Sequence, residues 1–146
     1  MNRTAASAAF LAVLLSACGK APPQSAASAA RRAAFKDYLP LTAQMRKTAN
    51  GDSPYRPEEF ERLAAEFARE APRPFQYFQN DPQGNGRARA EIWQQPERFQ
   101  KRRDDFYAAV AELDAAAQSR APDRIRAAYE RMEHSCRACH DDYRSP

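Results

Sequence analysis

The sequence predicts an all-α domain: an antiparallel four-helix bundle with one long crossover between the second and third helices. Its composition, with 11 Pro, 4 Gly and much Ala and Arg, does not suggest a sheet protein. In four stretches, mostly apolar side chains recur three or four residues apart, which is the spacing of one helix face. A proline-rich segment between the second and third stretches is too long for a tight turn. With 146 residues the chain is long enough for one domain, which we place at residues 28–146.

The first two predicted helices each have one face suited to packing. The first runs from about residue 28 to residue 49, and Pro40 should bend it because proline removes an amide donor. The second starts at Pro57, a residue suited to the first turn of a helix. The side chains that share a face are Phe35, Tyr38, Leu39, Thr42 and Met45 in the first helix and Phe60, Leu63, Ala64 and Phe67 in the second.

The crossover is predicted over residues 71–95, and two further helices follow it. Helix-breaking residues interrupt it at Pro72, Pro74, Pro82, Gly84 and Gly86. Aromatic side chains that can anchor it to the bundle are Phe75, Tyr77, Phe78 and Trp93. The third helix opens at Pro96 and the fourth near Pro122. Their apolar stripes comprise Phe99, Phe106, Val110, Leu113 and Ala117 in the third and Ile125, Ala128, Tyr129, Met132, Cys136, Cys139 and Tyr143 in the fourth.

The N-terminus is typical of an exported protein. Residues 1–17 carry one basic residue, Arg3, before an apolar run that is too short to span a membrane as a mature helix. The run ends in Leu15-Ser16-Ala17-Cys18, which resembles the lipobox of bacterial lipoproteins. We therefore expect residues 1–17 to be a signal peptide and Cys18 to carry the lipid anchor. An ordinary secretory signal with a chance Cys is the alternative.

The expected location is the periplasmic side of a membrane. Residues 18–27 are mostly small and polar, and we expect them to form a flexible tether. Gly19 and Lys20 stand where an Asp retention signal would stand, which favours the outer membrane. The formal charge of +4 arises from 23 basic and 19 acidic residues, and such a small excess does not imply a nucleic-acid partner.

A C-x-x-C-H motif near the C-terminus carries the chemistry. It reads Cys136-Arg137-Ala138-Cys139-His140, the signature of covalent c-type haem attachment. Residues three and four apart share a face of a helix, so both sulfurs can reach the porphyrin vinyl groups while His140 reaches the iron. The motif therefore predicts one covalently bound haem c.

Two other chemistries could use the same residues. A zinc site needs a fourth ligand, and the only other histidine, His134, lies on a different side of the predicted helix. A redox dithiol would not need His140.

A methionine as second iron ligand is not favoured either. Met132 is on the helix of the motif, and Met45 lies about 15 Å along the first helix from Phe35; both are interpreted as core residues.

Several further motifs resemble the cytochrome c′ family. The C-terminal half contains Glu91-Ile92-Trp93, then Pro96-x-x-Phe99, then Cys136-Arg137-Ala138-Cys139-His140-Asp141-Asp142-Tyr143-Arg144. The N-terminal half contains Arg31-Arg32-x-x-Phe35 and Gly51-x-x-Pro54-Tyr55. Together the motifs cover most of residues 31–144. The resemblance implies the bundle predicted above, because cytochrome c′ is a four-helix bundle.

The resemblance also implies a role for each matching residue. It implies a five-coordinate iron with His140 as its axial ligand and Phe35 closing the opposite, distal face. It places Arg31 and Arg32 near the haem propionates and Arg144 next to His140. Relatives often have Gln at the position of Arg32, and they often pair through their first two helices, which makes a homodimer an expectation.

The function implied by the resemblance is binding of nitric oxide and carbon monoxide, with protection against nitric oxide. An apolar distal lid offers no donor to stabilise bound dioxygen, which agrees with small neutral ligands. A periplasmic electron carrier with an unknown redox donor is the alternative. An enzyme is not expected, because nothing resembles the distal His and catalytic partner of a peroxidase.

Overall fold

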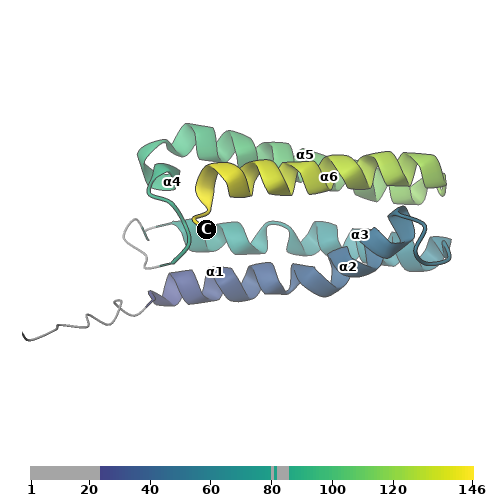
Figure 1. The fold of residues 1–146 in the computed structure, drawn as a ribbon, viewed down its shortest axis with the longest axis horizontal. Coiled ribbons are helices and arrows are strands. Elements are labelled where there is room, and N and C mark those ends of the chain that lie inside the picture. Colours follow the sequence, from purple (N-terminus) through teal and green to yellow (C-terminus); the bar gives the residue numbers. More distant parts are fainter. Residues whose placement is uncertain (1–23, 80, 82–85) are drawn as a thin grey trace, which may run out of the picture.

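The fold is an all-helical bundle, as predicted. The computed structural model describes residues 24–79, 81 and 86–146, so the predicted signal peptide and Cys18 lie outside the described residues. Four long rods run side by side, and the chain reverses direction between consecutive rods (Figure 1). Across the described residues no helix is long and apolar enough to cross a membrane.

The first rod consists of two helices, α1 (Ala26–Lys36) and α2 (Tyr38–Ala49), with a break at Asp37. Pro40 explains the break, because proline has no amide hydrogen and its ring clashes with the carbonyl four residues earlier, that of Lys36. The expected bend is thus present one turn before the proline. α1 begins two residues before the predicted boundary because the Ser25 hydroxyl accepts a hydrogen bond from the Ser28 amide at 3.0 Å.

The second rod is α3 (Pro57–Glu70), which begins at the predicted proline. The crossover that follows is partly helical. It contains a 3₁₀ helix, η1 (Arg73–Phe78), and one short turn, α4 (Glu91–Gln94). The prolines and glycines predicted a long crossover, and its helical turns pack on the bundle through the aromatic anchors: η1 lies against α1 and α4 against the next helix.

The last two rods are α5 (Pro96–Gln118) and α6 (Pro122–Tyr143), packed against each other as an antiparallel pair. The turn between them places Arg120 at a left-handed φ of 52°. Its guanidinium donates to Glu61 Oε1 at 2.6 Å and to Glu58 Oε1 at 3.0 Å, both on α3. These ion pairs connect the turn to α3, the neighbour of α5 in the bundle.

The core has two parts. The larger one fills the bundle and includes the fully buried Phe67, Leu113 and Met45. The smaller one lies under the crossover and consists of Ile92, Phe99 and Tyr143. The motif at the end of α6 lies where the two parts meet: Cys136 packs against the larger part and Cys139 against the smaller.

Candidate haem-binding site

The last turns of α6 hold Cys136, Cys139 and His140 on one continuous helix. Both thiols are half-buried against apolar side chains, and the Cys136 sulfur lies 3.8 Å from the Met132 sulfur. The pKa of each thiol is raised to about 11, mainly by burial and, for Cys136, also by the neighbouring Cys139. The thiols are therefore neutral at pH 7, which does not favour the reactive thiolate of a redox dithiol.

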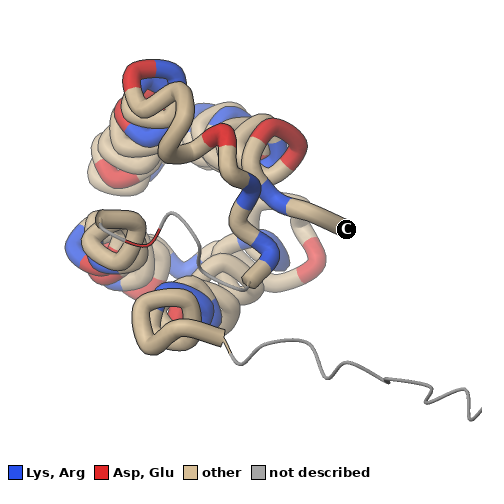
Figure 2. Tube along the Cα trace, turned by 90° about the vertical axis from the view of Figure 1, so that its left-hand side faces the viewer, with Lys and Arg blue, Asp and Glu red and all other residues tan. Residues whose placement is uncertain are grey.

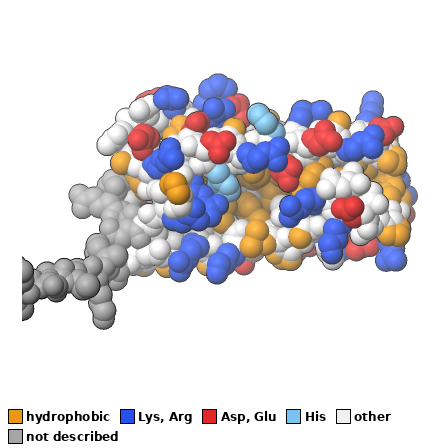
Figure 3. Space-filling view, in the orientation of Figure 1, with side chains coloured by type: hydrophobic (Ala, Val, Ile, Leu, Met, Phe, Trp, Pro, Cys, Tyr) orange, Lys and Arg blue, Asp and Glu red, His pale blue; other side chains and the backbone are white. Residues whose placement is uncertain are grey.

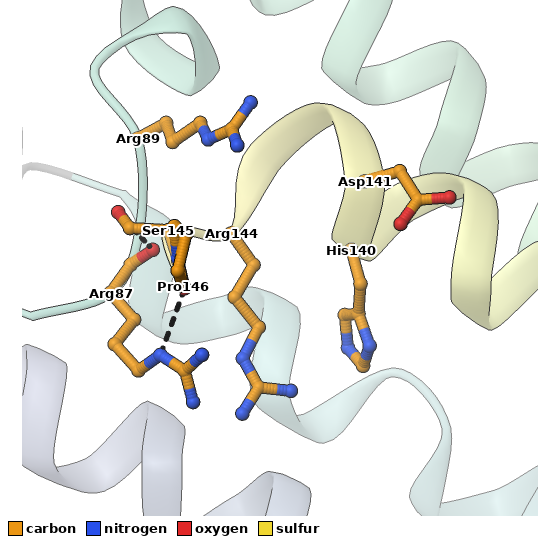
Figure 4. Close-up of a pocket in the computed structure, with 7 residues that line it drawn as sticks. All are labelled: Arg87, Arg89, His140, Asp141, Arg144, Ser145 and Pro146. Carbon is orange, nitrogen blue, oxygen red and sulfur yellow. Dashed lines mark hydrogen bonds between the residues drawn. The ribbon is translucent and has the colours of Figure 1, made fainter.

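His140 is the histidine that can serve as an iron ligand. It lies at the margin of an open pocket of about 400 Å³, lined by Arg87, Arg89, His140, Asp141, Arg144, Ser145 and Pro146 (Figure 4). Partial burial lowers the pKa of its imidazole, the Arg144 charge adds to this, and Asp141 opposes it. The neutral imidazole is the form that binds a metal, so the surroundings favour ligation.

The residues fit a haem and do not assemble a zinc site. In the described part of the chain, no group of three or more His, Cys, Asp or Glu side chains could hold a metal ion. His134, the other histidine, faces a separate hollow between α5 and α6. An apolar disc needs apolar walls, and hydrophobic side chains are exposed in a furrow between the α5–α6 pair and the α1–α2 rod (Figure 3). Two thiols and one imidazole beside such walls are the donor set of a c-type haem.

Phe35 belongs to an aromatic cluster at the same end of the bundle. Its ring centroid lies 5.6 Å from that of Tyr38, 5.9 Å from that of Phe75 and 6.4 Å from that of Phe78, each edge to face. Tyr38 is close enough to Cys136 for the thiol to influence its pKa. Phe35 and Cys136 both pack against the larger part of the core. Its place over the iron stays a prediction.

Arg31 and Arg32 differ in their surroundings. Arg32 is exposed, whereas Arg31 is buried with only 5% of its surface accessible. The Arg31 guanidinium donates to the Tyr77 carbonyl at 2.7 Å and to Asp81 Oδ2 at 3.2 Å. It also stacks over the Phe78 ring, 4.5 Å from the centroid. In this structure Arg31 therefore joins α1 to the crossover, and a contact of either arginine with a propionate stays a prediction.

Replacing Asp81 with alanine is expected to lower the free energy of unfolding by about 3 kcal/mol, because it leaves a buried guanidinium without its carboxylate. Asp123→Ala is the matched control: its ion pair with Arg126 is exposed, so we expect a change within about 0.5 kcal/mol. Urea denaturation of the haem-loaded protein, followed by circular dichroism, measures both. Equal small effects would show that Arg31 has another anionic partner when haem is bound.

Sequence reasoning missed two residues of the site, Arg87 and Arg89. They lie in the crossover, where no helical period marks them. An isolated β-bridge pairs Ala88 with Arg144 and brings both arginines beside His140. The sequence feature that could have pointed to them is the Arg87-Ala88-Arg89 run just before the Glu91-Ile92-Trp93 motif. Arg144 lines the same pocket as His140, and its role beside a bound haem stays a prediction.

Fold and motif together define a helical bundle whose last helix carries a C-x-x-C-H motif, which is typical of covalent haem attachment. A family model described as Cytochrome C′ matches residues 26–144. The chain therefore belongs to the cytochrome c′ family. The sequence is 41% identical over 59 residues to cytochrome c′ of Alcaligenes xylosoxydans xylosoxydans. This match covers 40% of the chain and spans about half (46%) of the length of that relative.

Solved structures resemble the chain over more of its length. A cytochrome c′ superposes with a TM-score of 0.78 at 28% identity, covering 82% of this chain and 94% of the other. A nitric oxide complex of a variant cytochrome c′ from Alcaligenes xylosoxidans superposes with a TM-score of 0.79, at the same identity and coverage. A carbon monoxide-bound variant of that protein gives the same values. The predicted family is therefore confirmed.

Proposed function

We propose that this chain carries one haem c, attached to Cys136 and Cys139 and ligated by His140, and that it binds nitric oxide and carbon monoxide. The two thiols and the imidazole on one turn of α6, set against apolar walls, are the observation that carries the proposal. Complexes of related proteins with both gases support it. When bound, a haem iron with one protein ligand supplies an open coordination position.

The side chains near Phe35 favour small neutral ligands. The rings of Phe35, Phe75 and Phe78 offer no strong hydrogen-bond donor. Two of the three polar aromatic neighbours use their donors elsewhere: the Tyr38 hydroxyl donates to the Ala71 carbonyl at 2.5 Å, and Trp93 Nε1 donates to the Phe78 carbonyl at 2.7 Å. The third, Tyr107, packs edge to face against Phe75 at 5.4 Å between ring centroids. Bound dioxygen would find no free donor on Phe35, Phe75, Phe78, Tyr38 or Trp93, whereas nitric oxide and carbon monoxide need none.

In this proposal His140 keeps its neutral imidazole toward the iron, and the haem-attaching thiols fix the cofactor to α6. With haem bound, Phe35 would exclude water and larger ligands from the iron by its volume. Sequestering nitric oxide in this way would protect the cell from it, which is the physiological role that we propose.

Adding carbon monoxide and then nitric oxide to the dithionite-reduced protein tests this function. We expect a high-spin optical spectrum before addition and a saturable shift of the Soret band with each gas, because a coordination position is open. Dioxygen should oxidise the iron without forming a stable complex. A low-spin spectrum that neither gas changes would contradict gas binding and would indicate an electron carrier.

We further propose that the chain is anchored on the periplasmic side, with the outer membrane favoured, through lipid on Cys18. The sequence Leu15-Ser16-Ala17-Cys18 supports this. The mass of the N-terminal peptide of the mature protein decides it: acylated Cys18 is expected, and a free thiol or an uncleaved N-terminus would contradict it.

A further inference from the structure

The outer side of the α1–α2 rod carries a row of basic and apolar side chains. Lys36, Leu39, Ala43 and Lys47 follow one another at intervals of three or four residues, so they share one face of the rod, which we name the basic face. Asp37 keeps helical backbone angles, φ −63° and ψ −19°, so this face continues across the break between the two helices. Seen end on, the rods surround a common centre and the α1–α2 rod is the lowest of them (Figure 2). The basic face is therefore directed away from the core.

The apolar member of this face is unusually exposed. Leu39 has 63% of its surface accessible and is the one exposed large hydrophobic side chain in the described part of the chain. It lies between Lys36 and Lys47 in the row, and both lysines are exposed as well. Figure 3 shows basic and hydrophobic side chains next to one another along the lower edge of the molecule, where Figure 1 has the α1–α2 rod. Such a mixture is typical of a helix that lies on a membrane surface.

The charge of the basic face is not neutralised within the described part of the chain. Residues 26–49 contain one acidic residue, Asp37, and its carboxylate accepts a hydrogen bond from Arg73 of η1 at 2.8 Å. The basic residues of this range are Arg31, Arg32, Lys36, Arg46 and Lys47. Of the ion pairs among the described residues none includes Lys36 or Lys47, whereas Lys101 on α5 pairs with Asp105 at 3.1 Å. The face is thus positively charged toward its surroundings.

The proposed lipid anchor is attached close to this rod. Cys18 lies seven positions before Ser25, the residue that caps α1. A chain spans at most about 3.5 Å per residue, so the tether reaches about 25 Å at most. The rod has a similar length, about 35 Å at helical rise. An acylated chain therefore keeps the basic face near the lipid headgroups, where a weak attraction is effective because the local concentration is high.

We propose that the basic face binds the anionic phospholipid headgroups of the membrane that holds the anchor, so that the α1–α2 rod lies along the membrane surface. Lys36 and Lys47 are attracted by the phosphate groups. Leu39 enters the boundary between headgroups and acyl chains, as apolar residues of interfacial helices do. A second copy of the chain fits less well, because a two-fold pair would bring the same basic residues of both subunits to one interface. This inference rests on the proposed lipid anchor and is independent of gas binding.

Acetylation of lysines in the acylated, haem-loaded protein on vesicles tests the proposal. We expect Lys36 and Lys47 to react several-fold more slowly on vesicles of phosphatidylglycerol than on vesicles of phosphatidylcholine. Lys101 is the internal control, because it is exposed on α5, which packs against α3 and α6. Equal reactivity of Lys36 and Lys47 on both vesicles would overturn the proposal. Protection without vesicles would also overturn it and would assign the face to a second copy. Loss of the protein from phosphatidylcholine vesicles would instead contradict the lipid anchor.

A second measurement does not need the anchor. Haem-loaded mature chain with Cys18→Ser is sedimented with phosphatidylglycerol vesicles at low salt. Adding Lys36→Gln/Lys47→Gln should weaken binding at least about tenfold, because each basic side chain near an anionic surface adds to the attraction. Adding Arg98→Gln/Arg124→Gln removes the same charge from exposed positions on α5 and α6 and should leave binding unchanged. Equal weakening by both pairs would reflect net charge alone and would overturn the proposal, as would absence of binding with Cys18→Ser alone.

Discussion

The double variant Cys136→Ala/Cys139→Ala is expected to contain no covalently bound haem. Both thiols lie on the same stretch of α6, each against an apolar part of the core, and no other described cysteine could replace them. Haem should therefore remain with the wild-type chain through denaturing electrophoresis and acid-acetone extraction, and it should be lost from the variant. The effect is all or none because thioether bonds form only at these sulfurs.

Ser135→Ala provides the control for this experiment. Ser135 precedes Cys136 on α6, and its hydroxyl donates to the Met132 carbonyl at 2.6 Å, so the variant perturbs the same turn without removing a thiol. It should retain its haem. If haem were extracted from the wild-type protein, or if the double variant kept it through denaturation, the assignment of both cysteines would be wrong.

The second large effect is expected for Phe35→Ala, which should bind carbon monoxide at least about tenfold faster. If the ring lies over the iron, an incoming ligand must displace it, and a tenfold change corresponds to about 1.4 kcal/mol of barrier. Removing the ring also leaves a cavity among Tyr38, Phe75 and Phe78. Because Phe35 is half-buried, we expect a loss of about 2 kcal/mol in stability, less than for a fully buried ring.

Flash photolysis of the ferrous carbon monoxide complex measures the association rate. Phe35→Val removes fewer atoms and is a second variant in case Phe35→Ala folds poorly. Phe60→Val is the control. Phe60 is fully buried in the larger core, and its aromatic neighbour is Tyr55, which is not part of the cluster around Phe35. It should lower stability without changing the rate. Association rates equal to wild type in both Phe35 variants would show that Phe35 is an ordinary core residue.

Local patterns were sufficient to predict the helices and the motif. Pro57, Pro96 and Pro122 each begin a helix where the sequence predicted one. The preference of proline for the first helical turn depends only on its own ring and missing amide hydrogen, so it can be predicted from the local sequence. The spacing of Cys136, Cys139 and His140 is likewise local, so their common place on α6 followed from helical geometry alone.

Features that depend on distant segments were not predicted. The helical turns of the crossover arise from packing against α1 and α5, which no local pattern shows. The pairing of Arg31 with the carboxylate of Asp81 joins residues 50 positions apart. The convergence of Arg87 and Arg144 depends on a β-bridge between the crossover and the C-terminal segment. Long-range pairings of this kind carry no periodic signal in a single sequence.

Resonance Raman spectroscopy of the ferrous protein tests most directly whether the chain holds a five-coordinate haem c with His140 as its one protein ligand. We expect the spectrum of a five-coordinate high-spin haem, with an iron–histidine stretching band that disappears in His140→Gly and returns when imidazole is added. His134→Gly should keep the band, because His134 faces a separate hollow. A six-coordinate low-spin spectrum, or a band that survives in His140→Gly, would contradict the account.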